Sequence, residues 1–290
     1  MVILLKNGIL TASVALKGAE LTSLIKSETE YIWQADATYW GRHTPVLFPI
    51  VGQLKNNSYF FEGKEYAMKQ HGFARDQEFK VEKQSDESVT LLLRSSEVTK
   101  ENYPFDFELR VTHSLNKNRL ATRYEVTNTQ TSEILFSIGG HPAYNCPLEK
   151  GHKRNEYAIR LDDAHEVKSK LLDNGTIGSN EKKVLENGNT LPLFDDAIFD
   201  QDAIIFDPNP FRKATVLHTS TKKEYLSLHF QGFPSLGIWS KNSSSPFVCI
   251  EPWYGISDYH NHDQQLINKK GIISLEAGKV FDCQYAVEVF

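Results

Sequence analysis

The chain has 290 residues, of which 37 are acidic and 32 are basic, so its net charge is -5 with neutral histidines. These charges are spread along the sequence, and without a basic stripe they argue against a nucleic-acid partner. Three cysteines without CxxC spacing fit a reducing compartment, and the first apolar run ends at Lys6, too early for a signal peptide. Because no apolar stretch approaches about 18–20 residues, the sequence predicts a cytoplasmic protein without a membrane span.

Alternation of apolar and polar residues predicts strands in nearly all of the chain. In the clearest case Phe107 and Leu109 share one face of a strand, and a turn at 116–118 leads to a partner strand. Around Gly63 the pattern predicts a tight hairpin, because glycine supplies the positive φ that such a turn needs. In chain order, we expect strands at 59–61, 64–66, 79–84, 89–94, 105–115, 120–126, 134–138, 203–206, 225–230, 236–239, 247–251 and 284–290.

Helical signals are few. A short helix is expected at 96–102, capped by Ser95 or Ser96 and ending before Pro104, and a second short helix is expected at 263–268. The polar stretch at 150–189 is expected to form surface loops and hairpins, because Asn-Gly pairs mark turns within it.

This pattern of many strands, short turns and few helices indicates an all-β sandwich or barrel. A chain of 290 residues made mostly of strands needs two large sheets packed face to face. Since no linker, repeat or low-complexity tract interrupts the sequence, we expect one domain over residues 1–290.

Four segments depart from the alternation and place functional groups beside glycine or proline: 40–52, 70–75, 137–144 and 249–255. Glycine lets a ligand or another backbone approach closely, and proline fixes a turn. In the third segment, His141 follows two glycines and precedes a proline, at the expected end of a strand. An ordinary turn with a surface or core histidine has the same pattern, since buried histidines are common.

Glu251 follows the apolar run at 247–250 and precedes Pro252. Apolar surroundings disfavour the charged carboxylate and raise its pKa, which suits a general base, although a strand-end glutamate paired with an arginine is the alternative. Together with His141 and His71, this group can move protons in both directions near neutral pH. The sequence has no strand–GxGxxG–helix motif and no phosphate-binding GxxxxGK loop, so we expect acid–base chemistry without a cofactor.

Other constellations allow two interpretations. A Cys–His nucleophilic pair using Cys249 or Cys146 is possible, but no flanking pattern supports it, and small buried side chains are the better interpretation. Asp200 and Asp202 can bind sugar hydroxyls or simply form a turn before a strand. One acidic and histidine-rich cluster can be a zinc site or a solvated loop, and we expect the loop and no metal: Asp258, His260, His262 and Asp263.

The four segments, in this order and at these distances, resemble the aldose 1-epimerase (galactose mutarotase-like) superfamily across nearly the whole chain. The matching motifs are HGFAR at 71–75, GGHP at 139–142 and EPW at 251–253, together with the run at 40–52. The nearest branch is similar to bacterial proteins encoded near lactose and galactose catabolic genes. This resemblance implies a large antiparallel β-supersandwich with an open sugar-binding cleft.

The resemblance also implies an isomerase that interconverts the α and β anomers of a hexose. Glu251 matches the general base that removes the proton of the anomeric hydroxyl, and His141 matches the acid that protonates the ring oxygen, so that the ring opens and recloses. His71 matches a second histidine that hydrogen-bonds the sugar oxygens. Asp200 is the best match to a sugar-binding aspartate, and Asp202 competes with it. Four aromatic residues are candidates for stacking on the sugar ring: Trp40, Tyr144, Trp239 and Trp253.

Two arginines depart from the pattern of typical galactose mutarotases, which do not carry the HGFAR form. Arg42 and Arg75 resemble the arginines that grip phosphate in the hexose-6-phosphate epimerase branch. The bidentate donors of arginine suit that role, while pairing with a nearby acid is the alternative. A free hexose and a hexose phosphate therefore both stay open as the small-molecule partner, for a monomer or a homodimer.

Two further classes of protein compete with the epimerase. One is a sugar-binding module on the same fold that has lost catalysis, because fold does not determine function. The other is a glycoside hydrolase that uses Glu251 with Asp200 or Asp202, which requires carboxyl groups about 5–9.5 Å apart. The presence of Glu251, His141 and His71 together favours the enzyme of the epimerase type.

Overall fold

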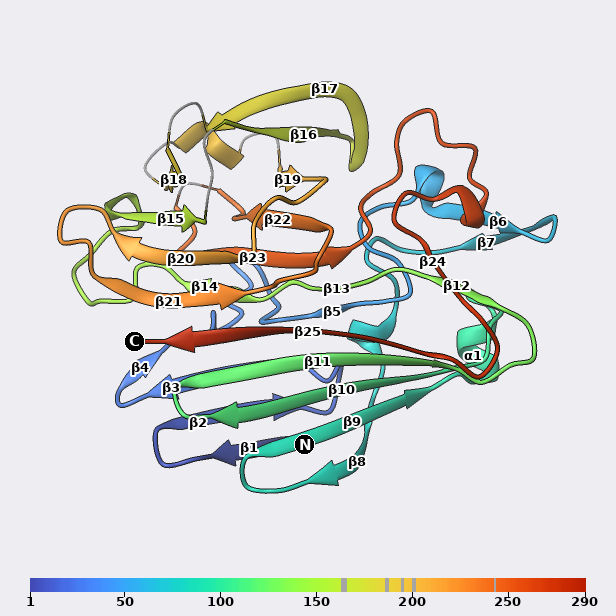
Figure 1. The fold of residues 1–290 in the computed structure, drawn as a ribbon, viewed down its shortest axis with the longest axis horizontal. Coiled ribbons are helices and arrows are strands. Elements are labelled where there is room, and N and C mark those ends of the chain that lie inside the picture. The colour runs from blue at the N-terminus through green and yellow to red at the C-terminus, as the bar shows by residue number, and fades with distance from the viewer. Residues whose placement is uncertain (163–165, 186–187, 194–195, 200–201, 243) are drawn as a thin grey trace.

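Antiparallel strands make up most of the computed structural model, which describes residues 1–162, 166–185, 188–193, 196–199, 202–242 and 244–290 (Figure 1). The strands form two large sheets and three small ones. The all-β class expected from the alternating sequence is therefore confirmed. No helix in these described ranges has the length and apolar character needed to cross a membrane.

The larger sheet has nine strands, and every neighbouring pair in it is antiparallel. Its long strand β10 (Phe107–Asn116) alternates between buried and partly exposed residues, as the sequence predicts. One strand, β25 (Val280–Val289), joins its two halves by pairing with both β11 (Arg119–Asn128) and β21 (Glu224–His229). In spatial order the strands are β18 (Thr190–Pro192), β15 (Tyr157–Leu161), β20 (Lys213–His218), β21 (Glu224–His229), β25 (Val280–Val289), β11 (Arg119–Asn128), β10 (Phe107–Asn116), β9 (Ser88–Arg94) and β8 (Lys80–Gln84).

The second sheet has eight strands and carries three of the four predicted motif segments. Its central strand β23 (Phe247–Tyr254) is buried on both faces, which explains why its sequence is a continuous apolar run rather than an alternation. The short strand β14 (Ala143–Asn145) pairs with β23 beside the main path of the sheet. That path is β17 (Thr176–Leu185), β16 (Val167–Asp173), β19 (Ile204–Phe206), β22 (Ser235–Trp239), β23 (Phe247–Tyr254), β13 (Ile138–Gly140) and β5 (Val46–Leu47).

The small sheets lie at the margins of this pair (Figure 1). Two of them are hairpin-sized: β6 (Ser58–Phe61) with β7 (Lys64–Ala67), and β12 (Ile134–Phe136) with β24 (Ile273–Leu275). The first of these confirms the hairpin expected around Gly63. The third was not expected from the sequence, and it consists of β1 (Val2–Lys6), β2 (Leu10–Ala15), β3 (Leu21–Lys26) and β4 (Thr29–Glu30).

Helix is confined to short pieces in the described ranges. The helix expected after Ser96 is confirmed as α1 (Glu97–Lys100), and the Ser96 hydroxyl accepts the Thr99 N–H. The helix expected at 263–268 is wrong, since only one 3₁₀ turn forms there. The Asp263 carboxylate accepts hydrogen bonds from the Gln265 N–H and the Asn268 side chain, which holds the segment in a turn. The 3₁₀ turns are Lys55–Asn57, Ala74–Asp76, Arg154–Glu156, Asp196–Phe199 and Leu266–Asn268.

The two large sheets share one apolar core, as sheet-on-sheet packing requires. From β23, Val248 and Ile250 point into this core. Because successive side chains of a strand point to opposite faces, Cys249, Glu251 and Trp253 lie on the other face of the eight-stranded sheet. That outer face is where the functional groups gather.

Candidate active site

A cleft opens on the outer face of the eight-stranded sheet, over the middle of β23. The space between its walls, open solvent included, is about 710 Å³. All four segments singled out in the sequence contribute to its walls, together with residues of β16, β19 and β22. The polar and aromatic residues that line it are Trp40, Gln70, His71, Arg75, His141, Asp202, Trp239, Glu251, Trp253 and Ser257.

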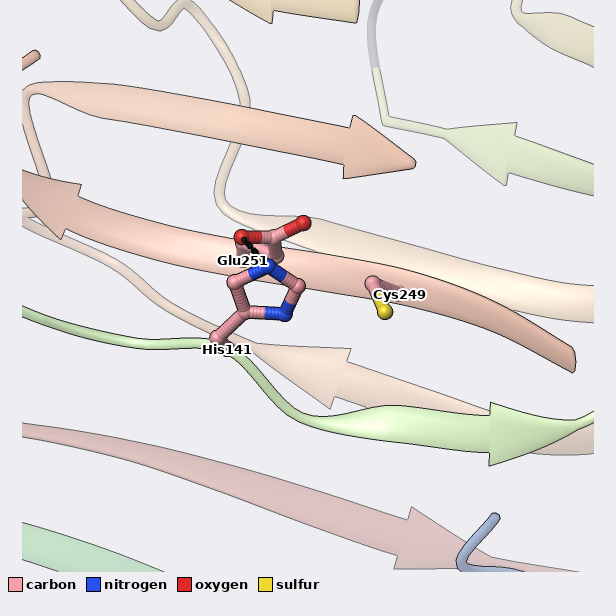
Figure 2. A group of neighbouring side chains, drawn as sticks. All are labelled: His141, Cys249 and Glu251. Atoms are coloured by element: carbon pink, nitrogen blue, oxygen red, sulfur yellow. Dashed lines mark ion pairs between the residues drawn. The ribbon is translucent and has the colours of Figure 1, made fainter. Parts of the chain in front are cut away.

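Glu251 and His141 meet on the floor of the cleft (Figure 2). The Nε2 atom of His141 lies 3.1 Å from Oε2 of Glu251, and the glutamate is 1% exposed. Burial raises the pKa of Glu251 well above its ordinary value, and the charge of Asp202 raises it further. For His141, burial lowers the pKa to about 3, and the charge of Arg75 acts in the same direction. Both shifts favour uncharged groups in the empty cleft.

This pair has unused hydrogen-bonding capacity. Within the described ranges, both carboxylate oxygens of Glu251 and Nδ1 of His141 are buried without a hydrogen-bond partner. The close contact of the two side chains is therefore not a well-aligned hydrogen bond. Buried polar groups without partners are rare in folded proteins, and here they face a cleft that can hold a ligand.

Two tryptophans fix the ring of His141. Trp40 stacks on it with ring centroids 4.7 Å apart, and Trp239 contacts it edge-on at 5.7 Å. The backbone also holds the residue in place, because the His141 N–H donates to the carbonyl of Pro45. The imidazole is thus positioned by packing on one side and by the sheet on the other.

His71 lies at right angles to His141, with ring centroids 5.6 Å apart. Its φ of 66 is unusual for a residue other than glycine, and it brings the ring back over the chain so that Nδ1 accepts the N–H of Gly52 at 3.1 Å. Burial lowers its pKa well below the ordinary value, and the nearby His141 and Arg75 add to this effect. A neutral imidazole that accepts at Nδ1 carries its hydrogen on Nε2, so His71 is a hydrogen-bond donor.

Trp253 is held between two glycines of the neighbouring strands. A Cβ atom at Gly139 would lie 2.6 Å from its ring, and one at Gly237 would lie 2.4 Å from it. The absence of side chains at these positions therefore makes room for the indole, which is 4% exposed. Its Nε1 is buried without a hydrogen-bond partner in the described ranges, and the residue lines the cleft.

The two arginines are close enough to affect each other. Burial lowers the pKa of Arg75 to about 10, and the charge of Arg42 contributes. Arg75 lines the cleft and donates to the carbonyl of Gln70 at 2.6 Å, while its Nε has no partner in the described ranges. Arg42 bonds Asp76 at 2.9 Å. The alternative interpretation, in which each arginine pairs with a nearby acid, therefore holds for Arg42 but not for Arg75, which lines the cleft.

Comparisons with known proteins show the family of the chain. The sequence model of the aldose 1-epimerase family matches residues 1–279. The chain belongs to the aldose 1-epimerase family. The protein LacX encoded on a plasmid of Lactococcus lactis subsp. lactis is 36% identical over 267 residues, which cover 89% of each chain.

Solved structures of the family share the fold. A galactose mutarotase related enzyme from Lactobacillus acidophilus is 33% identical with a TM-score of 0.93, and the match covers 100% of this chain and 97% of that one. A galactose mutarotase-like protein from Lactobacillus casei is 30% identical with a TM-score of 0.92, and the match covers 100% of both chains. The supersandwich implied by the sequence motifs is therefore confirmed.

Not every predicted site residue of this epimerase-family chain reaches the cleft. Tyr144 is 1% exposed and packs in the core between the large sheets, so it is not positioned to stack on a ligand. Asp202 lines the cleft, whereas Asp200 lies outside the described residues. Cys146 and Cys249 are fully buried, and burial raises the pKa of the Cys146 thiol to about 12 and the pKa of the Cys249 thiol well above its ordinary value.

The cluster at 258–263 is not a solvated loop throughout, and that expectation is wrong for Asp258. This carboxylate is 1% exposed and pairs with the fully buried Lys269 at 3.1 Å. Its neighbour Ser257 lines the cleft and accepts the N–H of Gln53 through its hydroxyl. Sequence reasoning missed Ser257 and Lys269, and since Lys269 stands between Asn268 and Lys270, no local signal marks it as buried.

Proposed function

We propose that this chain is a mutarotase that interconverts the α and β anomers of a hexose by acid–base ring opening and closure. The observation that carries the proposal is the buried Glu251–His141 pair, with its 3.1 Å contact and its unused hydrogen-bonding capacity on the floor of a cleft large enough for a sugar. Family membership and relatives described as galactose mutarotase related or galactose mutarotase-like support the same reaction.

The protonation of the pair fits both halves of the reaction. Burial favours a protonated Glu251 and a neutral His141, and the short contact allows that proton to pass from Oε2 to Nε2. The resulting carboxylate accepts the proton of the anomeric hydroxyl while the imidazolium donates to the ring oxygen. The C1–O5 bond breaks, the C1 carbonyl forms, and the pair returns to its uncharged state.

Ring closure uses the same groups in reverse. After rotation about C1–C2, the neutral His141 accepts the proton of the C5 hydroxyl, and the protonated Glu251 donates to the carbonyl oxygen as the new C1–O5 bond forms. Closing on the other carbonyl face gives the other anomer. Because each half-reaction moves one proton to the pair and one from it, no net charge is created in the buried site.

Donors around the pair bind the sugar and support the developing charge. His71 offers Nε2–H, and Trp253 offers an indole N–H that is fixed by the surrounding glycines. Trp40 and Trp239 line the cleft and serve as stacking surfaces for the sugar. Asp202 accepts from sugar hydroxyls and, through its charge, holds the pKa of Glu251 high.

A hexose 6-phosphate is the second candidate substrate, and the unpartnered Nε of Arg75 favours it. Changing Arg42 and Arg75 together to alanine should then raise KM for the 6-phosphate about tenfold or more while leaving KM for the free hexose nearly unchanged, because charge-assisted bonds to an ion each contribute about 1.5–3 kcal/mol. The matched control is Arg123→Ala, which removes a surface arginine of β11. Equal effects on both substrates would remove the phosphate role.

The test of the proposed function is the approach to anomeric equilibrium, followed by polarimetry or NMR from the pure α-anomers of glucose, galactose and their 6-phosphates. We expect acceleration with at least one of these sugars. Acceleration with the free sugars alone assigns Arg75 to structure, and acceleration with the 6-phosphates alone assigns it to phosphate. Folded protein that accelerates none of them would overturn the proposal in favour of a sugar-binding protein.

A further inference from the structure

Two residues on the floor of the cleft, His141 and Glu251, lie beside the fully buried Cys249, and together they are three potential metal ligands. An imidazole nitrogen of His141, the sulfur of Cys249 and a carboxylate oxygen of Glu251 are all within 4.8 Å of one another (Figure 2). We propose that these three side chains form a binding site for a soft divalent cation such as Zn²⁺, and that the bound cation blocks the cleft. The blocking of catalysis rests on the proposed function, whereas cation binding does not.

The fold explains why the three side chains meet. Cys249 and Glu251 are alternate residues of β23, so both point to the outer face of the sheet. Strand β13 pairs with β23 through Gly139 and Trp253, and His141 follows directly after β13. The imidazole is thereby placed against the two β23 side chains, as Figure 2 shows.

The bonding state of these atoms fits a bound ion better than a closed pair. Both oxygens of Glu251 and Nδ1 of His141 lack hydrogen-bond partners within the described ranges. The contact of 3.1 Å between His141 and Glu251 is not a well-aligned hydrogen bond, so both groups keep bonding capacity. Buried groups with unused lone pairs, grouped around a common point, provide what a cation needs from its first ligands.

The chemistry of the three ligands selects the type of cation. Thiolate, imidazole and carboxylate together are typical of Zn²⁺, whereas Mg²⁺ and Ca²⁺ prefer oxygen ligands alone. In a tetrahedral site with metal–ligand bonds of about 2.0–2.3 Å, the ligand atoms lie about 3.3–3.8 Å from one another. Side-chain rotations that move these atoms by about 1 Å therefore suffice to form the site. The cleft supplies the path of entry and a water molecule as the fourth ligand.

Charge balance also favours this complex in a buried position. A metal ion binds the thiolate and the carboxylate, so binding releases the proton of Cys249, and any proton on Glu251, to the solvent. One Zn²⁺ ion with a thiolate, a carboxylate and a neutral imidazole has no net charge. The bound ion uses the lone pairs that would otherwise accept protons from the sugar, so the cation and catalysis exclude each other.

The experiment is a titration of chelator-treated, full-length protein with Co²⁺, which reports its ligands by absorption. We expect one Co²⁺ per chain, with a thiolate charge-transfer band and the intense visible bands of a tetrahedral site. Cys249→Ala should abolish the charge-transfer band, and its affinity for Zn²⁺ should fall about tenfold or more. Cys146→Ala is the matched control, because it removes another fully buried thiol and should leave the band intact. Circular dichroism checks that each variant is folded.

Every outcome decides one part of the proposal. The absence of Co²⁺ bands in folded wild-type protein, or a charge-transfer band that persists in Cys249→Ala, would overturn the site, whatever the result of the mutarotation assay. Zn²⁺ should lower mutarotation about tenfold or more in the wild-type enzyme, and chelator should restore it. Binding without inhibition in a protein that accelerates mutarotation would overturn the blocking.

Discussion

Two buried carboxylates of this protein, Glu251 and Asp258, are both 1% exposed but differ in their surroundings. Asp258 has its bonding capacity filled: its oxygens accept from Nζ of Lys269 at 3.1 Å and from the N–H of Lys55 at 3.0 Å. Lys269 in turn donates to the carbonyl of Ile256. Glu251 has no hydrogen-bond partner in the described ranges and only the misaligned contact with His141.

This difference distinguishes a carboxylate that stabilises the fold from a carboxyl group that is available for a reaction. A buried ion pair whose members are fully hydrogen-bonded holds segments of the chain together. Removing one member strongly lowers the free energy of unfolding, because the other charge stays buried without a partner. A buried carboxyl group without partners contributes little to stability and is maintained because a ligand completes it. Burial alone therefore does not identify the reactive group, whereas burial without partners does.

The largest effect is expected for Glu251→Gln. The amide cannot accept the anomeric proton, so turnover should fall at least about 10²–10⁴-fold, while the unfolding midpoint stays near that of the wild type. Polarimetry and thermal unfolding of the same preparation check both statements. Near wild-type turnover would remove the role of Glu251 as the base.

For Asp258→Asn, in contrast, we expect the main effect on stability. Removing the charge leaves Lys269 buried without its counter-ion, and the free energy of unfolding should fall by about 3–5 kcal/mol. Urea denaturation measures this loss. A variant with wild-type stability but no turnover would show that Asp258 acts in the chemistry and would break the distinction drawn above.

Gly139→Ala tests whether the Trp253 indole is positioned by the glycines beside it. The added methyl group would lie 2.6 Å from the ring, so the indole must move, at a cost of about 1–3 kcal/mol and with a higher KM for the sugar. Gly41→Ala is the control, because that position has open space around it. Equal KM values for the two variants would mean that the orientation of Trp253 does not affect sugar binding.

The smallest effect concerns a buried histidine with partners on both ring nitrogens. His113 bonds Thr122 and the carbonyl of Ala19, and burial lowers its pKa to about 4. Above the unfolded pKa of about 6.5, both states are neutral; as the pH falls below it, the unfolded chain binds the proton first, so stability decreases. Between pH 7 and 5.5 this histidine should account for about 1 kcal/mol. Urea denaturation should show a smaller pH effect in His113→Asn than in the wild type, and an equal effect would contradict the assignment.

Much of this structure can be predicted from sequence, because strand periodicity and strand-end motifs are local signals. The alternation along β10 predicts its buried face, and the Gly139–Pro142 motif predicts where His141 lies. The strands β1–β4 were not predicted. One reason is that β2 alternates small residues such as Ala12 and Ser13, whose difference in hydrophobicity is a weak signal for a strand.

What the sequence cannot show depends on contacts between distant segments. Trp253 reads as a stacking surface, yet its ring is enclosed by Gly139 and Gly237, which belong to two other strands. Asp258 reads as part of a polar loop until Lys269 is placed beside it. The sequence predicts Tyr144 as an aromatic residue of the cleft, but Tyr144 pairs with Val248 of β23, and both side chains lie in the core.

The position of β25 has a consequence for how the chain acquires its structure during synthesis. This strand follows all the others in chain order, yet it is the only link between the β21 half and the β11 half of the nine-stranded sheet in the described ranges. Its Tyr285 also lies directly against Gly140 of the histidine motif. The two halves can each form hairpins on the ribosome, but the sheet, and with it the support beneath the cleft, is completed only after β25 has emerged.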